Sequence, residues 1–250
     1  MISGYGDLEG RRAIVTGGAG GIGAACARRL ATGGAQVTVL DVDASGAGNI
    51  AQQIGGEALV LDLCRPGPFP ALEADILVNN AGIQHLSPLE EFPAEIFERI
   101  IRLMLISPFE LIKAVLPGMY SRGWGRIINI SSIHGRHASP FKAAYVAAKH
   151  GLEGLSKVTA LEAGGKGVTS NCIAPGYVRT PLVDNQIAAQ AELHDMTADR
   201  VVQQIMLADA AIKRLIEPEE VAELAAYLCT PAAAIISGSS LAIDGGATAG

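Results

Sequence analysis

The sequence predicts an α/β protein: one doubly wound domain over residues 1–250, with a mostly seven-stranded parallel sheet between two layers of helices. Three observations carry this prediction. Short apolar runs with strand character alternate with longer stretches of helical periodicity along the chain. Most of these short runs end in Asp, Asn, Ser or Pro-Gly, residues typical of turns. No repeat, low-complexity tract or linker divides the 250 residues. In such a sheet, ligands bind outside the carboxyl ends of the strands.

Composition excludes several classes of protein. The net charge of -6, with no basic run, argues against nucleic acid as a partner. No apolar run reaches the roughly twenty residues of a membrane span, and the first residues lack the pattern of a signal peptide. The four cysteines are far apart in apolar contexts, which favours buried free thiols over a metal site or disulfides. We therefore expect a cytoplasmic protein without a bound metal.

The first βαβ unit has the features of a dinucleotide site. A strand at Ala13–Thr16 runs into a glycine-rich turn, a helix from about Gly21 to Thr32 and a second strand at Gln36–Leu40. Such a turn directs backbone N–H groups and a helix N-terminus at a pyrophosphate. The glycines that would permit the turn and a close approach are Gly17, Gly21 and Gly23.

Asp41, at the end of the second strand, predicts which dinucleotide binds. A carboxylate there can accept hydrogen bonds from ribose hydroxyls, and it would repel a 2′-phosphate. Neither Val42 nor Asp43 offers a positive charge that would offset this repulsion. The expected cofactor is NAD.

The next two strands end in further polar residues. Glu57–Leu61 is closed by Asp62, which would either hold an adenine amine or cap a turn, and the sequence favours neither alternative. Ala74–Val78 leads into Asn79, Asn80, Ala81 and Gly82. Only twelve residues, three of them proline, separate Asp62 from Asp75, so the crossover helix between these strands must be very short or absent.

The second half of the chain continues the alternation. Pro93–Tyr120 is predicted to be a long helix or a broken pair, kinked by Pro108 because this residue cannot donate to the carbonyl of Met104. The remaining predicted elements are strands at Arg126–Ile130, Val168–Ile173 and Leu241–Ile243, and helices at Ala143–Ala163 and Pro218–Thr230.

Three chemically active side chains lie in one short window: Ser132, Tyr145 and Lys149. Tyr145 and Lys149 are four residues apart in an alanine-rich helix, so they share a face. An ammonium beside a phenol favours the phenolate, which makes a base that works near neutral pH. Tyr-x-x-x-Lys taken alone is common by chance, and the other motifs must support this interpretation.

These motifs together resemble the short-chain dehydrogenase/reductase family in order and across essentially the whole chain. The resemblance implies a Rossmann fold in which Tyr145 is the general acid/base and Ser132 binds the reacting oxygen. It implies that Lys149 lowers the pKa of the tyrosine and holds the nicotinamide ribose, and that Thr180 holds the carboxamide. The expected cofactor-binding residues are Thr16, Gly17, Gly21, Ile22, Gly23, Asp41, Asp62, Leu63, Asn80, Ala81, Gly82, Tyr145, Lys149, Pro175, Val178 and Thr180.

Further motifs are Gly82-Ile83-Gln84-His85, Ser132-Ile133-His134-Gly135, Lys142, the segment Tyr177-Val178-Arg179-Thr180-Pro181-Leu182-Val183 and Gln186-Ile187. Within this family they resemble the D-3-hydroxybutyrate dehydrogenases. That resemblance implies that the substrate is bound by Gln84, His134, Lys142, Tyr177 and Gln186. A small anion does need a cation with several neutral donors, although ordinary surface polarity remains an alternative for Gln186. The expected reaction is the reversible NAD-dependent oxidation of (R)-3-hydroxybutyrate to acetoacetate. The alternatives are another small hydroxy acid, a sugar or a polyol as substrate, or a nucleotide-binding protein without turnover.

The chain departs from the family pattern at two positions. The family's catalytic asparagine is replaced by Met104, whose side chain cannot hydrogen-bond as an amide does. We hypothesise that Pro108 preserves the free carbonyl of Met104 and the water that it would hold. The hydroxybutyrate enzymes usually carry a tryptophan where this chain has Ala247, which suggests a roomier or differently closed pocket.

Residues 183–215 are an insertion between the sixth strand and the late helix, rich in Ala and Gln. They are predicted to form one or two amphipathic helices without a strong core pattern. We expect them to act as a substrate lid that brings Gln186 into the site, and a static pair of surface helices is the alternative. The family resemblance further implies a homotetramer.

Overall fold

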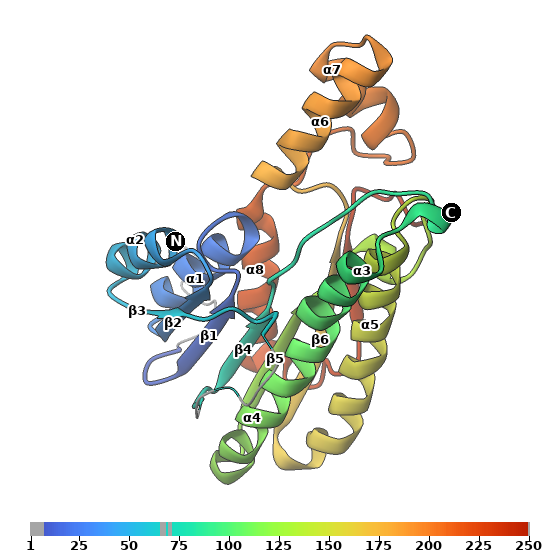
Figure 1. The fold of residues 1–250 in the computed structure, drawn as a ribbon. Helices are drawn as coiled ribbons and strands as arrows, with labels where there is room; N and C mark the ends of the chain where they lie inside the picture. The colour runs from blue at the N-terminus through green and yellow to red at the C-terminus, as the bar shows by residue number, and fades with distance from the viewer. Residues whose placement is uncertain (1–7, 66–68, 70–71, 250) are drawn as a thin grey trace.

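The structure is a computed structural model that describes residues 8–65, 69 and 72–249. Its centre is a seven-stranded sheet in the order β3-β2-β1-β4-β5-β6-β7, with every pair parallel (Figure 1). The strands are β1 (Arg12–Thr16), β2 (Gln36–Asp41), β3 (Glu57–Val60), β4 (Ile76–Asn79), β5 (Gly125–Ile130), β6 (Val168–Pro175) and β7 (Ser240–Ile243). The predicted fold class is confirmed, and the strand order reverses between β1 and β4.

Helices cover both faces of the sheet. They are α1 (Gly21–Thr32), α2 (Ala44–Ile54), α3 (Ala94–Ile101), α4 (Ser107–Arg122), α5 (Ala143–Ala163), α6 (Pro181–His194), α7 (Ala198–Val201) and α8 (Pro218–Leu228). Strand side chains alternate between the faces: Val15 packs with α1, α2 and α8, whereas Ile14 packs with α4. Both faces are therefore buried, as the apolar runs of parallel strands require.

Element boundaries lie close to the predicted ones. The predicted helix at Ala143–Ala163 coincides with α5, and the predicted strands differ by one or two residues at most ends. Between β3 and β4, the described residues 61–65, 69 and 72–75 contain no helix. The expectation of a very short or absent crossover helix is met there.

The predicted kink near Pro108 takes the form of a π-helical turn. Residues Arg102–Ile106 form this turn between α3 and α4, so that the helical path continues from Ala94 to Arg122. The backbone N–H of Ser107 and its hydroxyl both donate to the carbonyl of Arg102, the hydroxyl at 2.9 Å. The same hydroxyl lies 2.6 Å from the carbonyl oxygen of Leu63. The turn is thus tied to the loop that follows β3.

The insertion at residues 183–215, which is predicted to be a lid, stands away from the sheet (Figure 1) and has an apolar core of its own. Helices α6 and α7 and the π-helical turn Val202–Met206 enclose a cluster of Val183, Ile187, Val201, Met206, Leu207, Ala210 and Leu215. The cluster forms although no single helix of the insertion carries a strong core pattern. The cluster escapes a search for periodicity because three short segments and a loop contribute to it, instead of one helix face.

At its base the lid is closed by backbone pairing. The segment leading into α6 and the segment leading out of the insertion form a parallel bridge between Val178 and Ile216. Arg179 N–H donates to Ile216 O at 2.8 Å, and Ile216 N–H donates to Tyr177 O at 2.9 Å. The chain therefore enters and leaves the lid at one place.

Cys26, Cys172 and Cys229 are buried free thiols, as predicted, whereas Cys64 is half-buried at the edge of a cavity. The prediction of a buried thiol is wrong at Cys64, because the loop after β3 leaves this residue at the rim instead of under a helix. Within the described residues, no helix combines the length and the apolar character that crossing a membrane requires.

Candidate functional site

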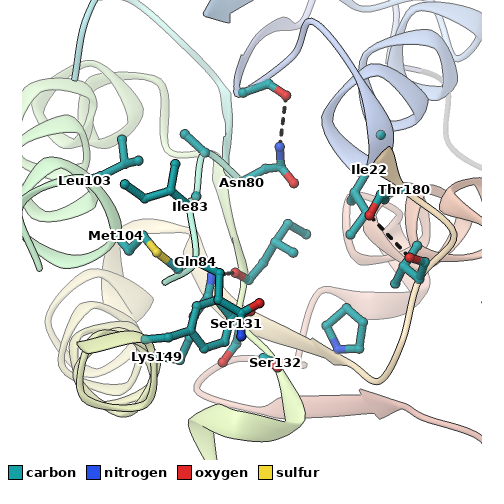
Figure 2. Close-up of a pocket in the computed structure, with 18 of the residues that line it drawn as sticks. Ile22, Asn80, Ile83, Gln84, Leu103, Met104, Ser131, Ser132, Lys149 and Thr180 are labelled. Atoms are coloured by element: carbon teal, nitrogen blue, oxygen red, sulfur yellow. Dashed lines mark hydrogen bonds between the residues drawn. The ribbon is translucent and has the colours of Figure 1, made fainter. Parts of the chain in front are cut away.

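The carboxyl ends of the strands surround a cavity of about 490 Å³ (Figure 2). Its walls come from the glycine turn, the loops after β2 to β6, helix α5 and the start of the lid. The predicted residues that line it are Gly17, Gly21, Ile22, Asp41, Asp62, Leu63, Asn80, Ala81, Gly82, Gln84, Ser132, His134, Lys142, Tyr145, Lys149, Pro175, Tyr177, Val178, Thr180 and Gln186. Of the predicted site residues, Thr16 and Gly23 are the two that do not line it.

The glycine turn is shaped to accept an anion. Gly17 and Gly21 have φ values of +63° and +51°, in the left-handed region that side chains rarely adopt. A Cβ on Gly23 would overlap the carbonyl oxygen of Gly17, so a glycine is needed there for α1 to approach the turn. No side chain caps the first turn of α1. The free N–H groups and the positive end of the helix dipole therefore suit a pyrophosphate.

Thr16 and Asn80 hold this turn from behind. The Thr16 hydroxyl accepts hydrogen bonds from the backbone N–H groups of Asn80 and Ala81, at 2.9 and 3.1 Å. The Asn80 amide donates to the carbonyls of Thr16 and Gly17, at 2.9 and 3.1 Å. Both Thr16 and Gly23 are buried and do not line the cavity, and their expected contact with a cofactor stays a prediction.

The two acidic residues at the strand ends have well-defined partners. The Asp41 carboxylate accepts from the backbone N–H groups of Ala19 and Asp43, both at 3.0 Å, which holds it at the edge of the cavity. Asp62 accepts from the N–H of Cys64 at 2.9 Å, so the turn-cap alternative is realised. Asp62 also lines the cavity, and its contact with an adenine amine stays a prediction.

Strand β5 and helix α5 bring the three predicted catalytic residues together. Ser132 follows the end of β5, and its hydroxyl accepts from the N–H of His134 at 3.2 Å. The Lys149 ammonium lies 5.6 Å from the centre of the Tyr145 ring and donates to Ile130 O at 2.6 Å. Lysine and tyrosine share one face of α5, as the four-residue spacing predicts.

Burial dominates the electrostatics of this pair. Burial raises the pKa of Tyr145, and a hydrogen bond with Ser132 partly offsets that rise. Burial lowers the pKa of Lys149 to about 8. The net effect of this arrangement is a raised pKa of Tyr145, and the expected stabilisation of its phenolate by Lys149 stays a prediction.

A second group of polar residues surrounds Lys142 next to the tyrosine. Lys142, which is 9% exposed, places its ammonium 2.9 Å from Nε2 of His134. Since an ammonium only donates, Nε2 of the histidine is the acceptor. Burial, reinforced by the charge of Lys142, lowers the pKa of His134 to about 4. A neutral imidazole and a cation therefore stand side by side near neutral pH.

The lid contributes one residue to this group. Gln186 on α6 donates its amide to Gln84 Oε1 at 2.7 Å, across 102 residues of sequence. Tyr177 lies opposite, with its ring centre 5.9 Å from the Lys142 ammonium. The five predicted substrate-binding residues thus line one part of the cavity. This contact favours a role in the site for Gln186 over ordinary surface polarity.

Met104 and several apolar residues complete the wall. Met104 is 1% exposed, and its terminal methyl lies close to Gly82 (Figure 2). The idea that its carbonyl holds a water stays a prediction. Sequence reasoning overlooked Ile83, Leu103 and Val183, which line the cavity but carry no chemical signal beyond their place beside predicted residues. Ala247 packs against the apolar cluster of the lid, which ties the end of the chain to that insertion.

The chain is similar to known oxidoreductases over nearly its full length. A family model described as "Enoyl-(Acyl carrier protein) reductase" matches residues 17–248. Proteins named D-beta-hydroxybutyrate dehydrogenase from Rhizobium meliloti and Cupriavidus necator are 44% and 41% identical to it. These alignments cover 96% of this chain and 99% and 98% of those proteins. A crystal structure described as "a putative NAD(P) dependent gluconate 5-dehydrogenase" from Beutenbergia cavernae, with bound NADP, superposes with a TM-score of 0.86. Its identity is 30%, over 98% of this chain and 99% of that one.

Proposed function

Because the chain belongs to the short-chain dehydrogenase/reductase family, we propose that it catalyses the reversible, NAD-dependent oxidation of (R)-3-hydroxybutyrate to acetoacetate. The cluster of polar residues around Lys142 is the observation that supports this substrate. A buried cation, a neutral imidazole and two amides line the same part of one cavity as the tyrosine hydroxyl. This set of donors suits a carboxylate on a short chain, because the charge lies within reach of the reacting end.

The cavity also fits a dinucleotide. The glycine turn and the N-terminus of α1 would hold the pyrophosphate, and Asp41 would accept from the adenosine ribose hydroxyls. Thr180 and Lys149 would hold the nicotinamide end. When bound, the nicotinamide supplies the acceptor for the hydride that leaves C3 of the substrate.

Residues of the chain itself transfer the proton. Tyr145, as phenolate, takes the proton of the substrate hydroxyl while Ser132 binds the same oxygen. Because burial raises the pKa of this tyrosine, the Lys149 cation at 5.6 Å is needed to stabilise the phenolate as it forms. Lys142 and the lid residue Gln186 fix the carboxylate, and closure of the lid would exclude water from the reacting atoms.

A second candidate is the same chemistry on a sugar acid. The structural relative from Beutenbergia cavernae is described as acting on gluconate, and it has NADP bound. A longer, hydroxyl-rich substrate would need donors along its whole length, whereas Ile83, Leu103 and Val183 line the wall with apolar surface. We therefore place gluconate second.

The test is NADH formation by the purified protein with (R)- and (S)-3-hydroxybutyrate, gluconate and a polyol. We expect turnover of the (R)-acid only. Lys142→Ala should raise KM about tenfold or more with a small change in kcat, because a charged hydrogen bond contributes about 1.5–3 kcal/mol. Lys113→Ala removes an exposed lysine on α4 and serves as the matched control. Turnover of gluconate alone would contradict the proposed substrate. Cofactor binding without turnover of any compound would contradict the proposal that the protein is an enzyme.

A further inference from the structure

A buried carboxylate lies behind the predicted catalytic lysine. Glu153 follows Lys149 by four residues on α5, and the two side chains are 6% and 4% exposed. The Glu153 Oε1 atom accepts from the hydroxyl of Ser240 on β7 at 2.9 Å. A Cβ on Gly135 would lie 3.1 Å from Glu153 Cγ and 3.2 Å from Lys149 O, so both residues pack beneath the turn that follows Ser132. A buried acid at this place requires an explanation, because its desolvation is costly.

Glu153 is the negative charge that acts on Lys149. Burial lowers the pKa of Lys149 to about 8, and the neighbouring groups that oppose the shift are Cys172 on β6 and Glu153. Burial also raises the pKa of the Cys172 thiol, so that thiol stays neutral in the working range. Tyr145 is a further titratable group near the lysine, with its ring centre 5.6 Å from the ammonium, and burial raises its pKa. Burial lowers the pKa of His134, on the turn that packs against α5, to about 4, so that imidazole is neutral near pH 7.

Met104 offers no such partner to the lysine. In the family pattern an asparagine occupies the position of Met104, and here that side chain is a thioether packed among Ile100, Ala144 and Ala148. A thioether is at best a weak acceptor and carries no charge. Among the described residues, the Ile130 carbonyl accepts from the Lys149 ammonium, and the Glu153 carboxylate belongs to the residue one helical turn further along α5.

We propose that Glu153 is a positioning residue that keeps the Lys149 ammonium charged and directed at the cavity. The carboxylate is fixed by Ser240 and by the helical spacing, and it offsets part of the desolvation of the lysine. This proposal rests on the proposed dehydrogenase chemistry for its effect on turnover. Its electrostatic part concerns cofactor binding alone and does not depend on which hydroxy acid is oxidised.

The test compares wild type with Glu153→Gln, which keeps the shape and removes the charge. NADH affinity is measured by fluorescence titration between pH 6 and pH 10, and kcat is measured where a substrate is turned over. Removal of the anion makes the ammonium lose its proton at lower pH. The midpoint of the alkaline loss of affinity should therefore move down by on the order of one pH unit. Glu153→Asp keeps the charge, so its midpoint should lie close to that of wild type.

Two further variants separate charge from packing. Ser156→Ala removes a neighbouring buried hydroxyl on α5 and should leave the midpoint unchanged, even if it lowers the melting temperature. Glu153→Met is measured if the glutamine variant does not fold. If Glu153→Gln or Glu153→Met keeps the wild-type midpoint of NADH affinity, the proposal is overturned. It is also overturned if Glu153→Asp shifts this midpoint as far as the neutral variant does. Failure of the hydroxybutyrate assay with a shifted NADH midpoint would instead reject the proposed substrate and support the role of Glu153.

Discussion

At the scale of single residues, Asp41 is the side chain that best separates two cofactors. Its carboxylate is held at the cavity edge by two backbone N–H groups, so it cannot easily turn away from a 2′-phosphate. A structural relative holds NADP, so the proposed preference of this chain for NAD requires a test at this position.

We expect Asp41→Ala to lower the preference for NAD over NADP, measured as the ratio of kcat/KM values, by about tenfold or more. The variant loses charged hydrogen bonds of about 1.5–3 kcal/mol to the ribose and also relieves repulsion of the phosphate. Asp43→Ala is the control, since its carboxylate caps α2 and does not line the cavity. Equal ratios in wild type and Asp41→Ala would contradict the assignment.

Polar lining residues could be predicted from the sequence because each follows a strand or lies at a fixed helical spacing. Tyr145 and Lys149 illustrate this: the four-residue spacing alone predicts that their side chains share one face of α5. Their pKa values could not be predicted, because burial depends on how β5, β6 and the lid pack around them. Apolar residues such as Leu103 line the cavity without any sequence signal, since apolar positions are also what a helix core requires.

At the scale of elements, the π-helical turn links the long helix to the cofactor side of the cavity. Ser107 connects the two through its hydrogen bonds to Arg102 O and Leu63 O. An irregularity at this place could be predicted from Pro108, because a proline inside a helix leaves a carbonyl of the preceding turn without its donor. Its π-helical form could not, since it depends on a contact with a residue 44 positions away.

Ser107→Ala should lower the free energy of unfolding by about 1–3 kcal/mol, because it removes the hydroxyl donor from the carbonyl of the buried Leu63. Leu63 lines the cavity, so the KM for NAD should also rise. The control is Ser121→Ala, whose exposed hydroxyl bonds only the nearby Gly118 carbonyl and should change stability by less than about 0.5 kcal/mol. Urea denaturation measures both variants, and equal midpoints would contradict the role of this hydroxyl.

At the scale of the whole molecule, α4 and α5 run side by side and carry exposed apolar residues (Figure 1). Leu161 is 86% exposed, Val158 51% and Phe109 49%. An apolar face of this kind on a monomer is typical of a subunit interface. Together with the family resemblance, it leads us to propose that the chain assembles as a homotetramer through this face.

A double variant, Val158→Glu with Leu161→Glu, should therefore shift the protein from tetramer toward smaller species in size-exclusion chromatography with light scattering. Burying these charges would cost several kcal/mol per interface, whereas the monomer fold would keep its core. Val60→Glu, on the edge strand β3 at the far side of the sheet, is the control for added charge. An unchanged mass for the double variant would place the interface elsewhere.

The pairing of Val178 with Ile216 makes the lid a closed insertion. The two ends of the inserted segment are already joined by this pairing. For the fold of the sheet, a change in the length of the segment therefore alters only the entropy of closing a loop. That entropy grows slowly, by about 0.6 kcal/mol for each doubling of length. The apolar cluster of the lid lies outside the two clusters that flank the sheet. Residues 183–215 could thus be exchanged for a shorter or longer segment without disturbing the register of the sheet, and substrate preference could be exchanged with them.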